Sequence, residues 1–323
     1  MIVKKNFPFK KVYVAGHNGM VGSSIVRKLK TLKKTEIITA DKKNLNLLDK
    51  KKVRKFLSLN KPDLIIIAAA KVGGIKSNNT FPADFIYENL SIQVNLINSA
   101  HEEGINSIVF LGSSCIYPRD SYQPIKERDL LGGYLEKTNE PYAIAKISGI
   151  KMCESYNRQF DRDYRSFMPT NLYGLGDTYD LENGHVLPSL IKKLHLAKIN
   201  NEEEVIIWGS GNQLREFLYS EDLADAIIFL SSLEKKEYEK NIKDSQSHIN
   251  IGSGNEISIK DLSELIKNIV GYKGKLIFDR SKLEGTPRKL LDSSIIKGYG
   301  WNCKTSLEAG VKAAYKDFLE NHN

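Results

Sequence analysis

Residues 11–29 read KVYVAGHNGMVGSSIVRKL, and this stretch decides the fold. An apolar, β-branched segment over 11–16 predicts a buried strand, and 20–32 predicts the helix that follows it. The turn between them has GxxGxxG spacing, which lets the backbone bend sharply and approach a pyrophosphate at the helix N-terminus. The pattern alone is weak, but its place in an opening βαβ unit predicts a dinucleotide contact through Gly16, Gly19, Met20, Val21 and Gly22.

Strand and helix patterns continue to alternate beyond this unit. Strands are predicted over 36–40, 63–70 and 107–113 and within 163–174, and helices over 50–59, 82–103 and 139–160. Buried apolar strands that alternate with helices indicate a parallel sheet covered on both faces. The fold class is therefore α/β, a Rossmann-type doubly wound parallel sheet.

The last third of the chain is less regular. Its strand patterns lie at 203–209, 247–254 and 275–279, and its helix patterns lie near 220–233 and 258–270. We expect a smaller C-terminal α/β substrate lobe here. Residues 1–175 are predicted to form the cofactor-binding domain and 176–323 mainly the substrate-binding lobe, with a blurred boundary where the chain can cross back near 210–250.

Composition excludes several classes of protein. The chain has 323 residues, of which 41% are hydrophobic and 27% charged, as in a soluble globular protein of one large or two ordinary domains. It contains no apolar run of 18 residues, so no membrane span is expected. We also expect no signal peptide.

The charge and the cysteines limit the partners. The net charge is +9, but the lysines are scattered rather than interleaved with aromatic residues. Nucleic-acid binding is therefore not expected, and the surface suits a small anionic substrate. The 3 cysteines have no metal-ligand spacing, which favours reduced thiols, a cytoplasmic location and no bound metal.

The end of the second predicted strand bears on the choice of cofactor. Asp41 stands about 20 residues after the glycines, where a carboxylate favours the free ribose of NAD. Lys42 and Lys43 follow, and cations there favour the 2′-phosphate of NADP. Asp41 could also cap the next turn, and the lysines could be surface residues. Asp49 is either an adenine contact or the N-cap of the helix over 50–59.

Tyr142 and Lys146 form the sharpest chemical signal. Residues four apart share one helix face, and an ammonium beside a phenol lowers the pKa of the phenol. Such a tyrosine can protonate a substrate oxygen as hydride arrives. A bare YxxxK pair is usually a surface pair, but this one follows the strand that ends at Ser113, whose hydroxyl can bind the same oxygen.

These residues resemble the extended short-chain dehydrogenase/reductases and, within them, the GDP-L-fucose synthase family. The resemblance covers almost the whole chain, in blocks that include AGHNGMVGSSIVRKL, LGSSCIYP, TNEPYAIAK, MPTNLYG, REFLYSEDLADA and GTPRKLLD. It implies an NADPH-dependent 3,5-epimerase/4-reductase that converts GDP-4-keto-6-deoxy-D-mannose to GDP-L-fucose. It also implies a homodimer through the helices near 82–103 and 139–160, and a role in polysaccharide biosynthesis.

The resemblance assigns two further residues to proton exchange. A C4 ketone makes the protons on C3 and C5 acidic, and inversion needs a base and an acid on opposite faces. The family pattern gives these roles to Cys115 and His185. A thiol with a pKa near 8.5 and an imidazole near 6.5 suit exchange close to neutral pH. The remaining histidines and cysteines are expected to be structural or surface residues.

The family pattern also supplies a substrate-binding set: Asn171, Lys193, Trp208, Arg215 and Lys289. Bidentate contact with a pyrophosphate would suit Arg215. The alternatives are a salt-bridged arginine, a core tryptophan and a solvated lysine. Lys193 and Lys42 stand where the family commonly has arginine.

Departures near the sugar pocket leave the sugar open. Gly184 replaces a common serine before His185 and could loosen its loop, and Leu175 replaces a common proline. The alternative is a C4-reductase without epimerase activity, acting on a related GDP-4-keto-6-deoxy sugar such as a heptose. A regulatory module that only holds a dinucleotide is disfavoured, because Tyr142 and Lys146 are both present.

Overall fold

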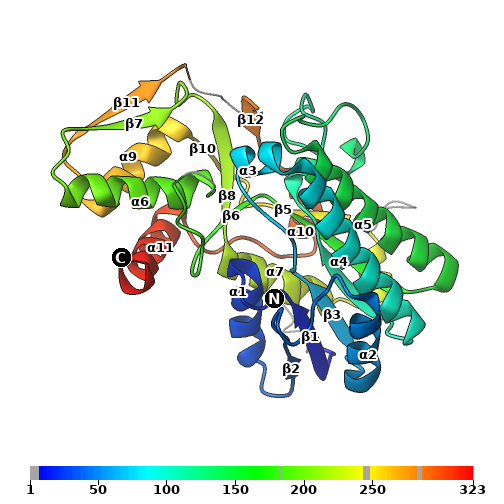
Figure 1. Cartoon of the computed structure of the whole chain (residues 1–323). Coiled ribbons are helices and arrows are strands. Elements are labelled where there is room, and N and C mark those ends of the chain that lie inside the picture. Colours follow the sequence, from blue (N-terminus) through cyan, green and yellow to red (C-terminus); the bar gives the residue numbers. More distant parts are fainter. Residues whose placement is uncertain (1–6, 182–183, 243–247, 282–285, 323) are drawn as a thin grey trace.

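The computed structural model describes residues 7–181, 184–242, 248–281 and 286–322, and a six-stranded parallel sheet forms its centre (Figure 1). The strand order is β2-β1-β3-β4-β5-β9, so the order reverses beside the first strand. This is the Rossmann-type doubly wound sheet predicted above. The strands are β2 (Glu36–Ile38), β1 (Lys11–Ala15), β3 (Leu64–Ile67), β4 (Ser107–Leu111), β5 (Asp163–Pro169) and β9 (His248–Ile251).

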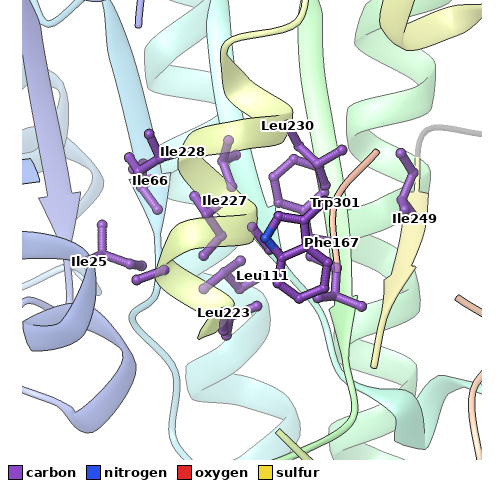
Figure 2. Close-up of a cluster of buried hydrophobic side chains, with 14 of the residues drawn as sticks. Ile25, Ile66, Leu111, Phe167, Leu223, Ile227, Ile228, Leu230, Ile249 and Trp301 are labelled. Carbon is purple, nitrogen blue, oxygen red and sulfur yellow. The ribbon is translucent and has the colours of Figure 1, made fainter. Parts of the chain in front are cut away.

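Helices cover both faces of this sheet. Val12 and Val14 of β1 point to one face, where they meet α1 (Met20–Lys30) and α7 (Ser220–Ser231). Figure 2 shows the centre of that layer, with Leu223 and Ile227 of α7 packed among residues of the strands. The alternate residues of the strands face the opposite layer, which is formed by α2 (Lys50–Asn60), α4 (Pro82–Glu102) and α5 (Glu140–Phe160). Because β1, β3 and β4 are buried on both faces, their segments read as nearly continuous apolar runs.

A second lobe has its own core. The helices α6 (Val186–Ile199), α9 (Ile259–Val270) and α11 (Leu307–Asn321) pack against β7 (Glu204–Trp208) and the outer face of β8 (Leu214–Tyr219). β7 pairs in parallel with β11 (Lys275–Asp279). β8 lies between β10 (Glu256–Ser258) and β12 (Arg288–Lys289), and it also pairs with β6 (Asn171–Tyr173).

Segments late in the chain return to the first sheet. α7 packs against α1, and β9 pairs in parallel with β5 as the sixth strand. Ile296 of α10 (Ser294–Gly298) and Trp301 are also buried in the layer of Figure 2. The second lobe is therefore connected to the sheet through several chain crossings.

Several details differ from the sequence-based expectation. The predicted strand within 163–174 is two strands, because the chain leaves the large sheet after Pro169 and β6 joins β8 instead. The apolar patterns of α6 and α11 were not assigned, and short helices form at α3 (Ile75–Thr80) and α8 (Lys235–Glu239). The strand predicted over 247–254 is β9, and residue 247 lies outside the described ranges. None of the helices in the described ranges is both long and apolar enough to cross a bilayer.

Candidate active site

The glycine-rich turn has the shape that a dinucleotide requires. Gly16 has φ of +86°, and a Cβ on it would lie 2.6 Å from the backbone nitrogen of Ala69. A Cβ on Gly22 would lie 2.0 Å from the carbonyl oxygen of Gly16, so only a glycine at this position lets α1 approach the turn this closely. Gly19 is the N-cap, and the first turn, which begins with Met20 and Val21, contains no acidic residue. Its amides and helix dipole are therefore suited to a pyrophosphate.

In the segment that follows β2, two aspartates accept hydrogen bonds from nearby backbone amides. The Asp41 side chain accepts a hydrogen bond from the Asn44 amide at 2.9 Å, which confirms the turn-capping alternative for this residue. Asp49 accepts from the amide of Lys52 at 3.1 Å and caps α2, so that alternative is also confirmed. Lys42 is exposed, as is its neighbour Lys43. Because Asp41 is used by its own turn, the lysines are the charges left for a 2′-phosphate.

Tyr142 and Lys146 lie on the first turns of α5, as their spacing predicts. Lys146 is buried, and its Nζ donates to the carbonyl oxygen of Leu111, the last residue of β4, at 2.8 Å. The same Nζ lies 5.7 Å from the centre of the Tyr142 ring and 5.0 Å from that of Phe110. Burial lowers the pKa of Lys146 to about 8. The helix thus places an ammonium beside the tyrosine at the carboxyl end of a central strand.

The tyrosine differs from the sequence expectation in its electrostatics. A lowered pKa was expected beside Lys146, but burial raises the pKa of the Tyr142 phenol, and the nearby Cys115 raises it further. Desolvation is the largest cause of the shift, and the hydrogen bond given for the ammonium goes to the Leu111 carbonyl. A raised pKa keeps the phenol protonated, which is the form that a proton donor needs.

Ser113 and Cys115 form a short turn after β4. Ser113 is the N-cap of the 3₁₀ turn Ser114–Ile116, and its hydroxyl accepts from the amide of Cys115 at 3.4 Å. Cys115 is 7% exposed. Burial raises the pKa of its thiol, while Lys289, Ser113 and Lys146 act in the opposite direction. The turn therefore sets a protonated thiol beside two ammonium groups.

His185 lies in the second lobe, at the N-cap of α6. Its side chain keeps access to solvent, yet the surrounding protein lowers the pKa of the imidazole by desolvation. The neighbouring Gly184 is tightly packed, since a Cβ there would lie 2.3 Å from the carbonyl oxygen of Asp180. The idea that Gly184 loosens this loop is therefore not supported: glycine fits because no side chain has room. Residues 182–183, which precede it, lie outside the described ranges.

Two of the predicted substrate contacts are neighbours across a strand pair. Lys289 of β12 is in register with Arg215 of β8. Desolvation lowers the pKa of both side chains, and in the described part of the chain neither forms a salt bridge. Asn171 joins them, because its Nδ2 donates to the carbonyl oxygen of Glu216 at 2.8 Å. The arrangement places two cationic side chains on neighbouring strands where a pyrophosphate is expected, with Glu136 acting on Lys289.

Lys193 and Trp208 form a separate group near the two-stranded β7–β11 sheet. Lys193, on the same helix that His185 begins, donates through Nζ to the carbonyl oxygen of Ile206. Trp208 is 55% exposed at the end of β7, so it is not a core tryptophan. The contacts thus assemble the predicted residues into three groups, on the glycine turn, at the Cys115 turn with β8–β12, and on α6 with β7.

Sequence reasoning missed the buried polar residues that hold these groups. Asn89 exchanges hydrogen bonds with both backbone groups of Lys71, and Gln93 donates to the carbonyl oxygen of Ala145 between Tyr142 and Lys146. Both interrupt the apolar face of α4, which is the signal that could have revealed them. The side chain of Asn250 bonds the hydroxyl of Tyr117 and the carbonyl oxygen of Ile125. Its backbone amide donates to the carboxylate of Glu127.

Several of the other histidines and cysteines have structural contacts. His195 packs on Phe318, and buried His248 contacts the carbonyl of Glu127. Cys153 is buried in the core, whereas Cys303 donates to Asp222 and is more than a space-filling group. Within the described ranges, no group of three or more acidic, cysteine or histidine side chains is arranged to hold a metal ion.

Comparison with known proteins agrees with this geometry. Residues 12–252 match the NAD dependent epimerase/dehydratase family. The GDP-L-fucose synthase of Escherichia coli K12 is 50% identical over 97% of this chain and 98% of its own.

Two solved structures have the same fold. A GDP-D-glycero-L-gluco-heptose synthase from Campylobacter jejuni, determined in the presence of NADPH, has a TM-score of 0.90 and 34% identity over 98% of this chain and 99% of its own. A GDP-L-fucose synthetase from Naegleria fowleri bound to NADP has a TM-score of 0.85 and 25% identity over 97% of this chain and 95% of its own. This chain belongs to the GDP-L-fucose synthase family, within the NAD dependent epimerase/dehydratases.

Proposed function

We propose that this enzyme converts GDP-4-keto-6-deoxy-D-mannose to GDP-L-fucose by 3,5-epimerisation and NADPH-dependent reduction at C4. One observation carries the proposal: the Tyr142–Lys146 pair and the Ser113–Cys115 turn meet at the carboxyl end of β4. The first pair suits reduction of a ketone, and the thiol beside it suits proton exchange next to that ketone. The 50% identity to a GDP-L-fucose synthase supports the GDP sugar.

The two proton-exchange residues have complementary protonation states. The raised pKa of Cys115 keeps its thiol protonated at neutral pH, and the lowered pKa of His185 keeps its imidazole neutral. The imidazole nitrogen can therefore accept a proton from carbon while the thiol Sγ supplies one to the opposite face. Lys289 and Lys146 stabilise the thiolate that remains at Cys115.

The reductive half uses residues of the first domain. The Tyr142 hydroxyl supplies the proton for the C4 oxygen, Ser113 offers a hydrogen bond to the same oxygen, and Lys146 stabilises the resulting phenolate. The turn over Gly16–Gly22, Lys42 and the start of α5 would hold the dinucleotide, with Asp49 near the adenine. Bound NADPH supplies the hydride for this reduction.

The alternative is a C4-reductase that acts on a heptose without epimerisation. The Campylobacter relative named for a heptose is 34% identical, compared with 50% for the Escherichia coli fucose synthase, so the fucose reading is favoured. Asn171, Lys193, Trp208, Arg215 and Lys289 would bind the GDP moiety in either case.

The first experiment incubates the enzyme with NADPH and GDP-4-keto-6-deoxy-D-mannose in D₂O and examines the product by NMR. Deuterium at C3 and C5 together with reduction at C4 is the expected result. Reduction with protium retained at both carbons would instead support the C4-reductase.

Repeating the reaction with NADH tests the cofactor. Lys42→Ala should reduce the preference for NADPH over NADH by about tenfold, which is the scale of a charge-assisted contact.

We also propose a homodimer formed by α4 and α5. Tyr87 and Val94, seven residues apart on one face of α4, are exposed, as is Ile144 of α5. Exposed apolar residues at helical spacing indicate a helix partner. Light scattering should give a dimer for the native chain and a monomer for Val94→Lys.

The described cysteines are free thiols, which supports a cytoplasmic location. We retain the division at residue 175 as a proposal for which part of the chain mainly binds cofactor and which mainly binds substrate.

A further inference from the structure

Glu216 is a buried carboxylate that the proposed chemistry does not use. It follows Arg215 in β8, so the two side chains point to opposite faces of the strand. Glu216 has no exposed surface, whereas Arg215 is partly accessible. A carboxylate is costly to bury unless its oxygens accept hydrogen bonds, so its partners reveal what it does.

Both carboxylate oxygens accept backbone amides from other segments. Oε1 accepts from Gly254 at 2.7 Å, in the loop that follows β9, and Oε2 accepts from Leu291 at 3.1 Å. Burial raises the pKa of this carboxyl, and the two amides oppose that shift. Gly252 completes the contact, because a Cβ on it would lie 2.3 Å from Oε1.

Leu291 lies two residues after Lys289, and this is where the contact reaches the site. β12 consists of only Arg288 and Lys289, so its ladder with β8 is short. A two-residue ladder fixes a strand weakly, and the chain after it is held by further hydrogen bonds. Leu290 and Asp292 bond the segment 123–125, and the amide of Leu291 donates to Glu216. Of these contacts, the one from Leu291 to Glu216 ties the chain after Lys289 to the same strand that carries Arg215.

The backbone of Glu216 holds a further segment. Its carbonyl oxygen accepts from Asn171 Nδ2 at 2.8 Å and from the hydroxyl of Thr170 at 3.3 Å. One residue therefore connects the segments that carry Asn171, Arg215 and Lys289, three of the residues proposed to bind the GDP moiety.

We propose that Glu216 is a positioning residue for the nucleotide-sugar site, whose carboxylate sets the separation of Arg215 and Lys289 and thereby the affinity for a nucleoside diphosphate. The inference rests on the proposed function, since it concerns the same site. Glu216 itself does not touch the substrate. Its removal should weaken diphosphate binding without changing dinucleotide binding, because none of these hydrogen bonds of Glu216 reaches a residue of the glycine turn.

The test measures GDP and NADPH binding by titration calorimetry for Glu216→Gln and Gly252→Ala. The glutamine presents an amide group to one of the two backbone amides, and the alanine methyl displaces the carboxylate without altering it. Each variant should raise the Kd for GDP by about tenfold, because a hydrogen bond from a backbone amide to a charged acceptor is lost. The Kd for NADPH should be unchanged. The double variant should be no weaker than the single ones, since both act on one contact.

Matched controls separate positioning from general loss of stability. Glu264→Gln removes an exposed carboxylate of the same lobe, and Gly298→Ala adds a methyl group with no heavy atom within 4 Å. Both should bind GDP as the native enzyme does. If Glu216→Gln does not fold, Gly252→Ala and Glu216→Asp provide the same comparison, with KM for the GDP sugar rising while kcat is retained.

Equal GDP affinity in native and variant enzymes would overturn the inference and leave the proposed function intact. An equal loss of GDP and NADPH affinity would also overturn it, because that pattern indicates a general defect. A native enzyme that binds no GDP would overturn the proposed function and, with it, the inference.

Discussion

The two pairs proposed to handle protons in this enzyme are built in different ways. Tyr142 and Lys146 lie one helical turn apart on α5, whereas Cys115 follows a central strand and His185 begins a helix of the second lobe. Helix geometry by itself brings the first pair onto one face of α5. The second depends on how two lobes pack, so its function should be sensitive to contacts far from either residue.

Tyr142→Phe should give the largest effect and separate the two pairs. Loss of the proton donor should slow reduction at C4 by about 100- to 10,000-fold, the usual contribution of general acid catalysis. Deuterium exchange at C3 and C5 should continue. NADPH oxidation and NMR in D₂O measure the two activities.

The control for this variant is Tyr156→Phe. Tyr156 lies on the same helix, but its hydroxyl donates to Asn98, which is not one of the proposed site residues. A Tyr142→Phe enzyme that reduced the ketone at the native rate would show that another group donates the proton.

Cys115→Ser should have the opposite selectivity. A serine hydroxyl is a far weaker acid than a thiol, so exchange at the inverted carbons should fall by about 100-fold while NADPH-dependent reduction persists. The NMR spectrum should then show a C4-reduced sugar with protium retained. Cys303→Ser is the control, since that thiol contacts Asp222 outside the site. Native exchange in Cys115→Ser would remove the thiol from the mechanism.

The pH dependence of reduction should report on Lys146. Burial lowers its pKa to about 8, so the ammonium that stabilises the Tyr142 phenolate is present below that pH and lost above it. The reduction rate should fall by up to about tenfold per unit as pH rises through 8. Lys146→Arg should remove this fall, because a guanidinium stays protonated. A fall at the same pH in the arginine variant would assign it to another group.

Tyr179→Phe should have the smallest effect and tests how the chain shortly before His185 packs on α11. The Tyr179 hydroxyl donates to the carbonyl oxygen of Ala314 in α11 at 2.8 Å, and its ring packs on Phe318. The substitution keeps the ring and loses about 1 kcal/mol of hydrogen bonding, so exchange should slow by about fivefold. Reduction should not change.

Tyr315→Phe is the matched control, because its hydroxyl contacts His195 within the core of the second lobe. If Tyr179→Phe slowed reduction and exchange equally, the second lobe would be acting on the whole site and the contrast between the pairs would fail.

Much of the first domain could be predicted because its signals are local. The strand, glycine turn and helix over 11–30 follow from β-branched residues, three glycines and an amphipathic segment, and the structure confirms each. The division of 163–174 into two strands could not be predicted, because both pieces have the same pattern and only their partners, β9 and β8, distinguish them.

The sequence by itself determined the alternation of strands and helices, the glycine turn and the tyrosine–lysine pair, since each depends on residues close together in the chain. Tertiary structure alone decided the raised pKa of Tyr142, the charges around Cys115 and the anchoring of Lys289 through Glu216. These depend on desolvation and on contacts between residues far apart in the sequence, such as Glu216 and Leu291. Burial and distance arise only when the chain has folded, so no local pattern encodes them.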